Sequence, residues 1–359
     1  MAKVCYILNS FNIGGIERVT VSLANALSKY HKIDLFVLKN QGDLKTTLTP
    51  NVNVVSFEYL NVKSLLKPLV VYLKEAQPDF LVTSIYPISV IGKFSLKIAK
   101  SSCRLIITHH ALFDIENKKN PVFDFFLLKI IRNTYNWAYR TFAVSKGVFD
   151  FLKRIGVRNV EIMFNPIDIE EKKHNAYYEN ENIAELGKYV LFLGRLAPIK
   201  NIELIEKAFA LFITDLRYKS YNFVIIGNGP EEEKLKKLAE KLGISEKCKF
   251  LGSKGYPEAY IKNADLLLMA SFSEAMPVTV MEAFSFNVPV VTTPARGCMD
   301  IFELLGYEYY TNSFDDEDEY CNLMKTLIEK KDSFSWLAQK ISENYGTESI
   351  ISKWNEILR

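Results

Sequence analysis

Two cations stand at the end of an apolar run in the second half of the chain. Arg195 comes directly after Gly194, and Lys200 and Asn201 follow just before a predicted helix. A guanidinium can bind two phosphate oxygens at once, whereas an ammonium supplies a point charge. With the N–H groups of the helix start, the two cations could hold a diphosphate and stabilise it as it leaves. The alternative is a solvated loop whose cations share no ligand.

Two carboxylates form a second group. Glu274 precedes Pro277, which suits the first turn of a helix, and Glu282 lies more than one turn further along that helix. The pair could bind two separate diols, one on a sugar and one on a ribose. A capping carboxylate and a solvated helix carboxylate are the alternative. The neighbours of Glu282 are apolar, however, so its solvation is not evident.

Glycines mark two further turns. Gly14 and Gly15 follow the first predicted strand and would let the backbone approach a ligand closely, although a plain turn is the alternative. No G-K-[ST] follows them, which excludes a P-loop. The turn from Gly227 to Gly229 suggests a dinucleotide site. Glu232 stands where the third glycine of G-x-G-x-x-G belongs, so an NAD-dependent oxidoreductase is kept only as an alternative function.

Two adjacent histidines, His109 and His110, end another predicted strand. Neighbouring side chains on a strand point to opposite faces, so the two are poor ligands for one zinc ion. One imidazole near a reacting sugar is the more specific hypothesis, and a core or surface histidine is the alternative.

The elements that must position these residues alternate regularly. Nearly uniform apolar runs are separated by amphipathic stretches, which predicts parallel sheets covered by helices on both faces. The runs lie at 4–8, 33–38, 52–57, 80–85, 105–108, 141–144, 189–193, 222–226, 248–251, 265–269 and 288–292. Each half of the chain repeats the design. We therefore expect an α/β protein with two doubly wound Rossmann-like domains facing a cleft, and ligands beyond the carboxyl ends of the strands.

Charge divides the chain in a similar way. Residues 1–170 hold 22 basic and 13 acidic residues, and the remainder holds 23 and 29. A basic half favours an anionic partner such as a phosphorylated acceptor or a membrane face, although a solvated lysine-rich surface is the alternative. We expect a first domain at 1–170, a polar linker at 171–187 and a second domain at 188–345.

Composition excludes several classes. Hydrophobic residues make up 48% and charged residues 24% of the 359, which is not typical of disordered or collagen-like chains. Five scattered cysteines without a C-x-x-C pair argue against a disulfide framework or a zinc site and fit a reducing cytoplasm. The first residues predict a strand, not a signal peptide, and no apolar run approaches the roughly 20 residues of a membrane-spanning helix.

In their joint order these motifs resemble the retaining glycosyltransferases of family 4 (glycosyl transferases group 1), which have the GT-B fold. The resemblance covers nearly the whole chain. Its most specific part is Glu274 through Glu282, which matches the E-x7-E signature of the family. Ala275 replaces the usual glycine after the first glutamate, and its methyl group could narrow the sugar pocket.

The resemblance implies roles for the residues. Arg195 and Lys200 would hold the donor diphosphate, Glu282 the ribose, and Glu274 the transferred sugar; with His110 these form the expected catalytic set. His109 is the neighbouring possibility for the family histidine. On the donor side the resemblance points to Gly14, Gly15, Gly194, Arg195, Lys200, Asn201, Gly227, Leu251, Gly252, Glu274, Ala275, Met276, Pro277, Val278 and Glu282. On the acceptor side it points to His109, Glu17 and Asn165.

The function implied is transfer of a hexose or N-acetylhexosamine from a nucleotide diphosphate, expected to be UDP, to a lipid-linked or polysaccharide acceptor of a bacterial surface glycan. No metal, cofactor or nucleic acid is expected. Residues 346–359 would form a helix that packs back on the first domain. A nucleotide-sugar-binding subunit without catalysis is the other alternative.

A basic and aromatic stretch at 122–139 is relevant to where in the cell the protein works. Such a helix can seat a protein at a lipid interface, although the core face of a doubly wound helix is the alternative. We expect a cytoplasmic protein that lies peripherally at the inner face of the membrane.

Overall fold

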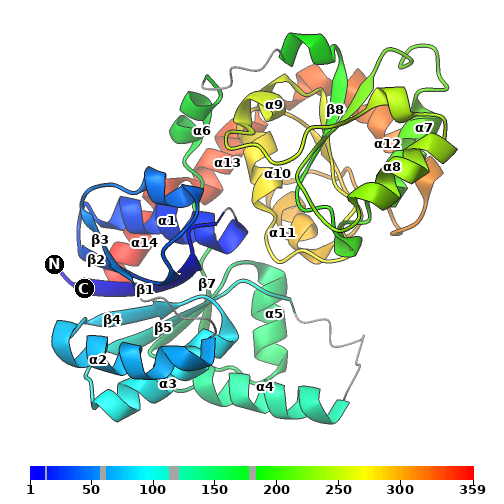
Figure 1. Cartoon of the computed structure of the whole chain (residues 1–359). Coiled ribbons are helices and arrows are strands. Elements are labelled where there is room, and N and C mark those ends of the chain that lie inside the picture. Colours follow the sequence, from blue (N-terminus) through cyan, green and yellow to red (C-terminus); the bar gives the residue numbers. More distant parts are fainter. Residues whose placement is uncertain (13, 57–61, 113–120, 178–182) are drawn as a thin grey trace. The chain divides into compact units, whose positions relative to one another are not determined.

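The computed structural model describes residues 1–12, 14–56, 62–112, 121–177 and 183–359 (Figure 1). Its contacts divide the chain into two compact units. One unit is Met1–Pro166 together with Thr347–Arg359, and the other is Ile167–Gly346. Each is built around one parallel sheet with helices on both faces, which confirms the predicted fold class.

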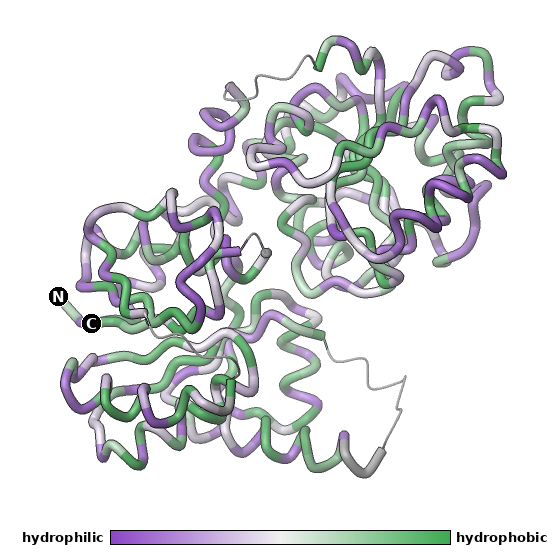
Figure 2. Tube along the Cα trace, in the orientation of Figure 1, coloured by the Kyte–Doolittle hydropathy of each residue, from purple (hydrophilic) through white to green (hydrophobic). Residues whose placement is uncertain are grey.

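The first unit contains a seven-stranded sheet in the order β3-β2-β1-β4-β5-β6-β7. Its strands are β1 (Lys3–Ser10), β2 (Lys32–Lys39), β3 (Val52–Ser56), β4 (Phe80–Thr83), β5 (Arg104–His109), β6 (Arg140–Ala143) and β7 (Val160–Ile162). The central strands are hydrophobic along their length (Figure 2). This composition follows from burial on both faces of a parallel sheet.

Helices cover the two faces of this sheet. They are α1 (Gly15–Leu27), α2 (Leu66–Ala76), α3 (Tyr86–Ala99), α4 (Pro121–Tyr135), α5 (Lys146–Arg154) and α14 (Thr347–Ile357). Helices α2, α3 and α4 lie side by side below the sheet in Figure 1, whereas α1 and α14 pack together on its other face. The amphipathic stretches at 16–30, 62–76 and 123–139 and the expected helix at the end of the chain correspond to α1, α2, α4 and α14. Helices α3 and α5 were not predicted.

The last helix is a core element of the first unit. Trp354 on α14 is 1% exposed and packs its ring against Tyr6 of β1 and Phe142 of β6, with centroids 6.3 and 5.4 Å away. Removing a side chain of this size from a core costs about 3–5 kcal/mol. Residues at the two ends of the chain therefore stabilise one unit.

The second unit contains a five-stranded sheet in the order β10-β9-β8-β11-β12. Its strands are β8 (Tyr189–Leu193), β9 (Asn222–Ile226), β10 (Cys248–Phe250), β11 (Leu266–Leu268) and β12 (Val290–Val291). Its helices are α6 (Ile169–Asn175), α7 (Ile202–Phe212), α8 (Glu232–Lys241), α9 (Glu258–Asn263), α10 (Val278–Ser285), α11 (Arg296–Leu305), α12 (Glu317–Glu329) and α13 (Leu337–Tyr345). Helix α7 packs against α8 and α12, and α10 packs against α9 and α13.

The stretch 171–187, expected as a linker, lies in the second unit. Its described part includes most of α6 and a short 3-10 turn at Ile183–Leu186.

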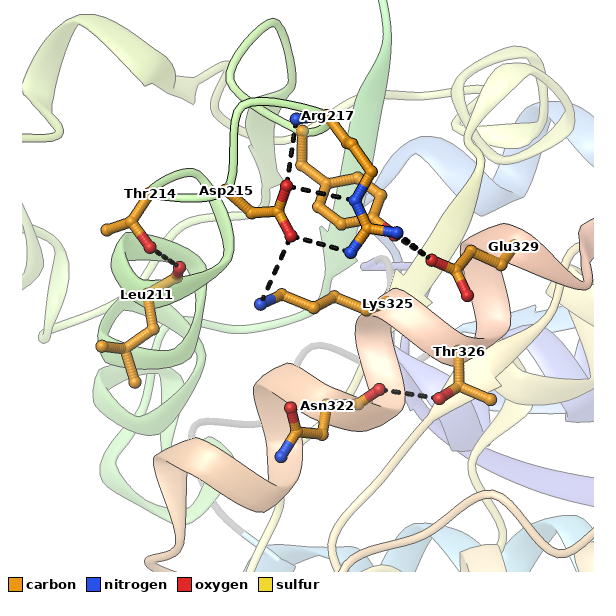
Figure 3. Close-up of polar contacts among 9 residues, drawn as sticks. Leu211, Thr214, Asp215, Arg217, Asn322, Lys325, Thr326 and Glu329 are labelled. Carbon is orange, nitrogen blue, oxygen red and sulfur yellow. Dashed lines mark hydrogen bonds and ion pairs between the residues drawn. The ribbon is translucent and has the colours of Figure 1, made fainter.

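The turn that leaves α7 is held to α12 by charge (Figure 3). The Asp215 carboxylate accepts from Arg217 at 2.8 Å and lies 3.9 Å from Lys325, while Arg217 donates to Glu329 at 2.7 Å. The adjacent Arg217 lowers the pKa of Asp215 to about 2. Exposed ion pairs contribute little stability, so we assign this network to orienting the turn.

Candidate functional site

The loops after β8 and β9 run against each other at the carboxyl edge of the second sheet. The amide of Gly194 donates to the Ile226 carbonyl at 3.0 Å. A Cβ at Gly227 would lie 1.9 Å from the Gly194 carbonyl oxygen, and a Cβ at Gly229 would lie 2.1 Å from that of Leu196. Close approach of two backbones therefore accounts for the glycines on which the dinucleotide alternative depended.

Lys200 and Glu274 meet although they are 74 residues apart. The Lys200 ammonium donates to the Glu274 carboxylate at 2.5 Å, and the Ser271 hydroxyl donates to the same oxygen at 2.7 Å. Lys200 ends a 3-10 turn after β8, and Glu274 lies in the loop between β11 and α10. The structure thus joins one cation and one carboxylate of the predicted site.

Gly297, which sequence reasoning missed, supports this loop. Its amide donates to the Glu274 carbonyl at 3.0 Å at the start of α11. A Cβ at this position would lie 2.5 Å from that oxygen and 2.6 Å from the Ala275 carbonyl oxygen. Glycine at 297 therefore lets α11 close on the backbone that presents Glu274. A lone glycine at a helix start carried no sequence signal for this role.

Other predicted donor-side residues lie in loops or directly before a helix. Arg195 is exposed, and its guanidinium forms no ion pair within the part of the chain that the structure describes. Pro277 precedes α10 without a capping side chain, so the first N–H groups of this helix lack a side-chain acceptor there. Met276 is buried beside it. These groups have the positive polarity that a phosphate or sugar oxygen requires.

Glu282 lies on α10 and is 2% exposed. Its carboxylate lies 2.8 Å from the ammonium of Lys172 on α6, which also donates to Glu258 on α9 at 2.8 Å. The apolar neighbours of Glu282 had left its solvation open in the sequence, and the structure buries it. Lys172 and Glu258 were missed because nothing in the local sequence links them to Glu282.

Asn201 and Gly252 have backbone partners. The Asn201 amide donates to the Phe314 carbonyl at 2.8 Å, and the Gly252 carbonyl accepts from the Gly227 amide at 2.8 Å. Asn201 also lines a cavity of about 740 Å³ at the start of α7, whose wall includes Phe272 and Phe314 but neither Arg195 nor Lys200. Sequence reasoning did not predict this cavity.

In the first unit, Gly14 and Gly15 begin α1. A Cβ at Gly14 would lie 2.3 Å from a carboxylate oxygen of Glu17, so Glu17 folds back over the helix start. A Cβ at Gly15 would have no described atom within 4 Å, which leaves room beside this backbone.

The two histidines have different surroundings. His109 is buried, lies 2.8 Å from the Tyr135 hydroxyl and stacks on Phe151, so it is a core residue of the first unit. His110 is half-buried and lies 3.1 Å from the Thr108 hydroxyl. Burial lowers the pKa of His109 to about 4 and, together with the charge of His109, that of His110 to about 3. Both imidazoles are neutral near pH 7, and His110 is the better placed of the two to meet a ligand.

The remaining observations concern Asn165, the cysteines, metal-binding side chains and membrane-spanning helices. Asn165 is buried in the first unit. All five cysteines are buried and unpaired. Among the described residues, no three His, Cys, Asp or Glu side chains form a metal site. No helix in the described ranges is both long and apolar enough to span a bilayer.

Two doubly wound units on one chain are the architecture of the GT-B glycosyltransferases. The profile described as glycosyl transferases group 1 matches residues 174–344, and that of glycosyltransferase family 4 matches residues 13–171. The chain belongs to glycosyltransferase family 4.

Relatives point to the same activity. An alpha-1,4-N-acetyl-D-galactosaminyltransferase of Campylobacter jejuni, named for an undecaprenol-diphosphate-linked acceptor, is 29% identical over 80% of this chain and 78% of its own. The amylovoran biosynthesis glycosyltransferase AmsD of Erwinia amylovora is 22% identical over 97% and 96%. The structure of Anabaena HepE in complex with UDP-glucose superposes with a TM-score of 0.82 at 20% identity, over 100% of this chain and 99% of that one. The protein is a glycosyltransferase with the GT-B fold.

Proposed function

We propose that this glycosyltransferase moves a hexose or an N-acetylhexosamine from a UDP-sugar to a lipid-linked or polysaccharide acceptor, with retention of the anomeric configuration and without a metal. The observation that carries the proposal is the contact of Lys200 with Glu274. Lys200 lies on the loop after β8, which also holds the exposed Arg195. Cations bind the anionic diphosphate of a nucleotide sugar, and carboxylates accept hydrogen bonds from its hydroxyl groups.

The second unit supplies the donor chemistry in this proposal. As the bond between the anomeric carbon and the diphosphate oxygen breaks, negative charge grows on the diphosphate. Arg195, Lys200 and the uncapped start of α10 stabilise that charge. Glu274, released from Lys200 when the diphosphate binds, accepts hydrogen bonds from the sugar hydroxyls. Glu282 accepts from the ribose, and the loop at Leu251 and Gly252 lies against the base.

The proposed transfer needs no nucleophile from the protein. The acceptor hydroxyl oxygen bonds to the anomeric carbon on the face from which the diphosphate departs. Its proton passes to the departing diphosphate oxygen, so no charge is left on the product. His110, neutral near pH 7 because burial lowers its pKa, orients a hydroxyl by hydrogen bonding and adds no charge. Gly15, Glu17 and Asn165 belong to the first unit, which we assign to the acceptor.

The acceptor class is inferred from the names of two relatives. The Campylobacter enzyme is named for a polyprenyl-diphosphate-linked glycan, and AmsD for an exopolysaccharide. A chain that meets such a lipid-linked acceptor would work at the inner face of the cell membrane. Capsule, O-antigen or exopolysaccharide synthesis is the corresponding process.

Transfer by the purified wild-type protein tests the proposal. The protein is incubated with UDP-glucose, UDP-galactose or their N-acetyl forms, an undecaprenyl-diphosphate-linked glycan and EDTA. We expect UDP release that depends on the acceptor, persists in EDTA and yields an α-linked product by NMR. A β-linked product would refute retention, and loss of transfer in EDTA that Mg²⁺ restores would refute metal independence. Binding of a UDP-sugar without transfer to any acceptor would favour the alternative of a non-catalytic subunit.

A further inference from the structure

Three charged side chains from three helices meet inside the second unit. The Lys172 ammonium of α6 lies 2.8 Å from a carboxylate oxygen of Glu258 on α9 and 2.8 Å from one of Glu282 on α10. The side chains of Lys172, Glu258 and Glu282 are 14, 2 and 3% exposed. Helices α6, α9 and α10 pack against one another, so the cluster is a built feature of this unit.

One ammonium, that of Lys172, contacts two buried carboxylates in this cluster. Removing a charge from water costs several kcal/mol unless a partner compensates it. Two buried carboxylates without the cation would repel each other. The second oxygen of Glu258 accepts no hydrogen bond within the described residues, so Lys172 is its principal compensation there.

The neighbouring lysine shows that the placement of Lys172 is specific. Lys173, the next residue of α6, is 52% exposed and pairs with Glu170 on the surface of the same helix. Asp168 caps the start of α6, and its carboxylate accepts from the Glu171 amide at 2.9 Å. This cap fixes the start of the helix, so Lys172 turns inward and Lys173 outward.

We propose that Lys172 is a positioning residue for the donor nucleotide, which holds the Glu282 carboxylate oriented toward the ribose against repulsion by the competing carboxylate of Glu258. The inference rests on the role proposed for Glu282. Glu258 then makes Lys172 necessary, since without the ammonium its negative charge would repel the Glu282 carboxylate.

The test measures the dissociation constant of UDP by calorimetry, and the donor KM and kcat, in matched variants. Lys172→Met should weaken UDP binding by about tenfold or more, equivalent to about 1.4 kcal/mol. Adding Glu258→Gln to Lys172→Met removes the competing charge and should recover most of that loss. Donor KM should rise more than kcat falls. Lys173→Met, the control, should bind UDP as the wild type does.

Several outcomes separate this inference from the proposed function. Unchanged UDP binding in Lys172→Met overturns the inference, and so does a loss that Glu258→Gln fails to recover, since that lysine would serve packing alone. If Lys172→Met does not fold, the single variant Glu258→Gln tests the inference instead. We expect it to bind UDP at least as tightly as the wild type, and a tenfold loss of UDP affinity would overturn the inference. Unchanged binding in Glu282→Ala would instead refute the ribose role under the proposed function.

Discussion

A single buried carboxyl, Glu206 on α7, sets a pH dependence of stability. It is 0% exposed, and neither of its oxygens has a hydrogen-bond partner within the described residues. Burial, reinforced by the charge of Glu203, raises the pKa of Glu206 from 4.5 to about 8. The folded protein therefore keeps this proton up to about pH 8, whereas the unfolded chain loses it near pH 4.5. The free energy of unfolding should fall as pH rises through this range.

Glu206→Gln removes this titration while preserving the shape of the side chain. The variant should match the wild type near pH 5 and exceed its free energy of unfolding at pH 8 by on the order of 1–3 kcal/mol. Urea unfolding at several pH values measures the difference. Glu240→Gln, an exposed change on α8, should leave the pH slope unaltered. A Glu206→Gln protein with the wild-type slope would contradict the raised pKa.

Individual site residues differed in how far the sequence predicted them. Lys200 and Glu274 carried local motifs, and the structure brings them together. Lys172 and Gly297 carried none, because their roles arise from packing of helices distant in sequence: Lys172 and Glu258 are 86 residues apart. Which of two adjacent histidines was buried also depended on their surroundings, since Tyr135 and Phe151 enclose His109.

The elements were predictable where their hydrophobic pattern was plain. Continuous apolar runs predicted every strand of both sheets except β7, a three-residue edge strand with two exposed residues. Helix α3 was missed for a related reason. It exposes Phe94 and Ile98, 52 and 54% accessible, and these obscure the helical period of its buried face.

Helix α4 and the turn after it also expose apolar side chains. We call the exposed apolar set of the two neighbouring helices the α3–α4 surface: Phe94, Ile98, Phe125, Phe126, Ile130 and Trp137. Lys93 and Lys97 lie 5.8 and 5.7 Å from the Trp137 ring centroid, and Lys93 donates to the Asn133 carbonyl, which joins the two helices. The stretch 122–139 therefore has both buried and exposed apolar residues. Ile131 and Tyr135 face the core, as in one alternative, whereas Phe125 and Phe126 face solvent.

We propose that the α3–α4 surface binds an anionic membrane through aromatic insertion and lysine charge. The wild type should float with phosphatidylglycerol vesicles at low salt and less at high salt. Phe125→Ser with Phe126→Ser should reduce the floated fraction severalfold, because two apolar anchors are lost. Leu216→Ser, at an 83% exposed site in the second unit, is the control and should float normally. Flotation of the double variant equal to that of the wild type would exclude this surface.

The two parts of the chain carry opposite net charge, and we propose a different task for each. Residues 1–170 carry an excess of basic residues and include the α3–α4 surface, whereas the remainder is acidic and contains the Lys200–Glu274 contact. A lysine-rich half suits a lipid-linked or membrane-borne acceptor. In the acidic half, Arg195 and Lys200 follow β8, where we propose that the donor diphosphate binds. The central claim is that these cations stabilise the leaving diphosphate.

Sugar transfer by Arg195→Ala and Lys200→Ala tests that claim most directly. Each should lower kcat/KM for the UDP-sugar by about a hundredfold or more, because a group that stabilises charge in the transition state is removed. Lys219→Ala, an exposed cation of the same unit, should transfer at the wild-type rate. Circular dichroism should show all three folded. Wild-type transfer by either Arg195→Ala or Lys200→Ala would contradict the account.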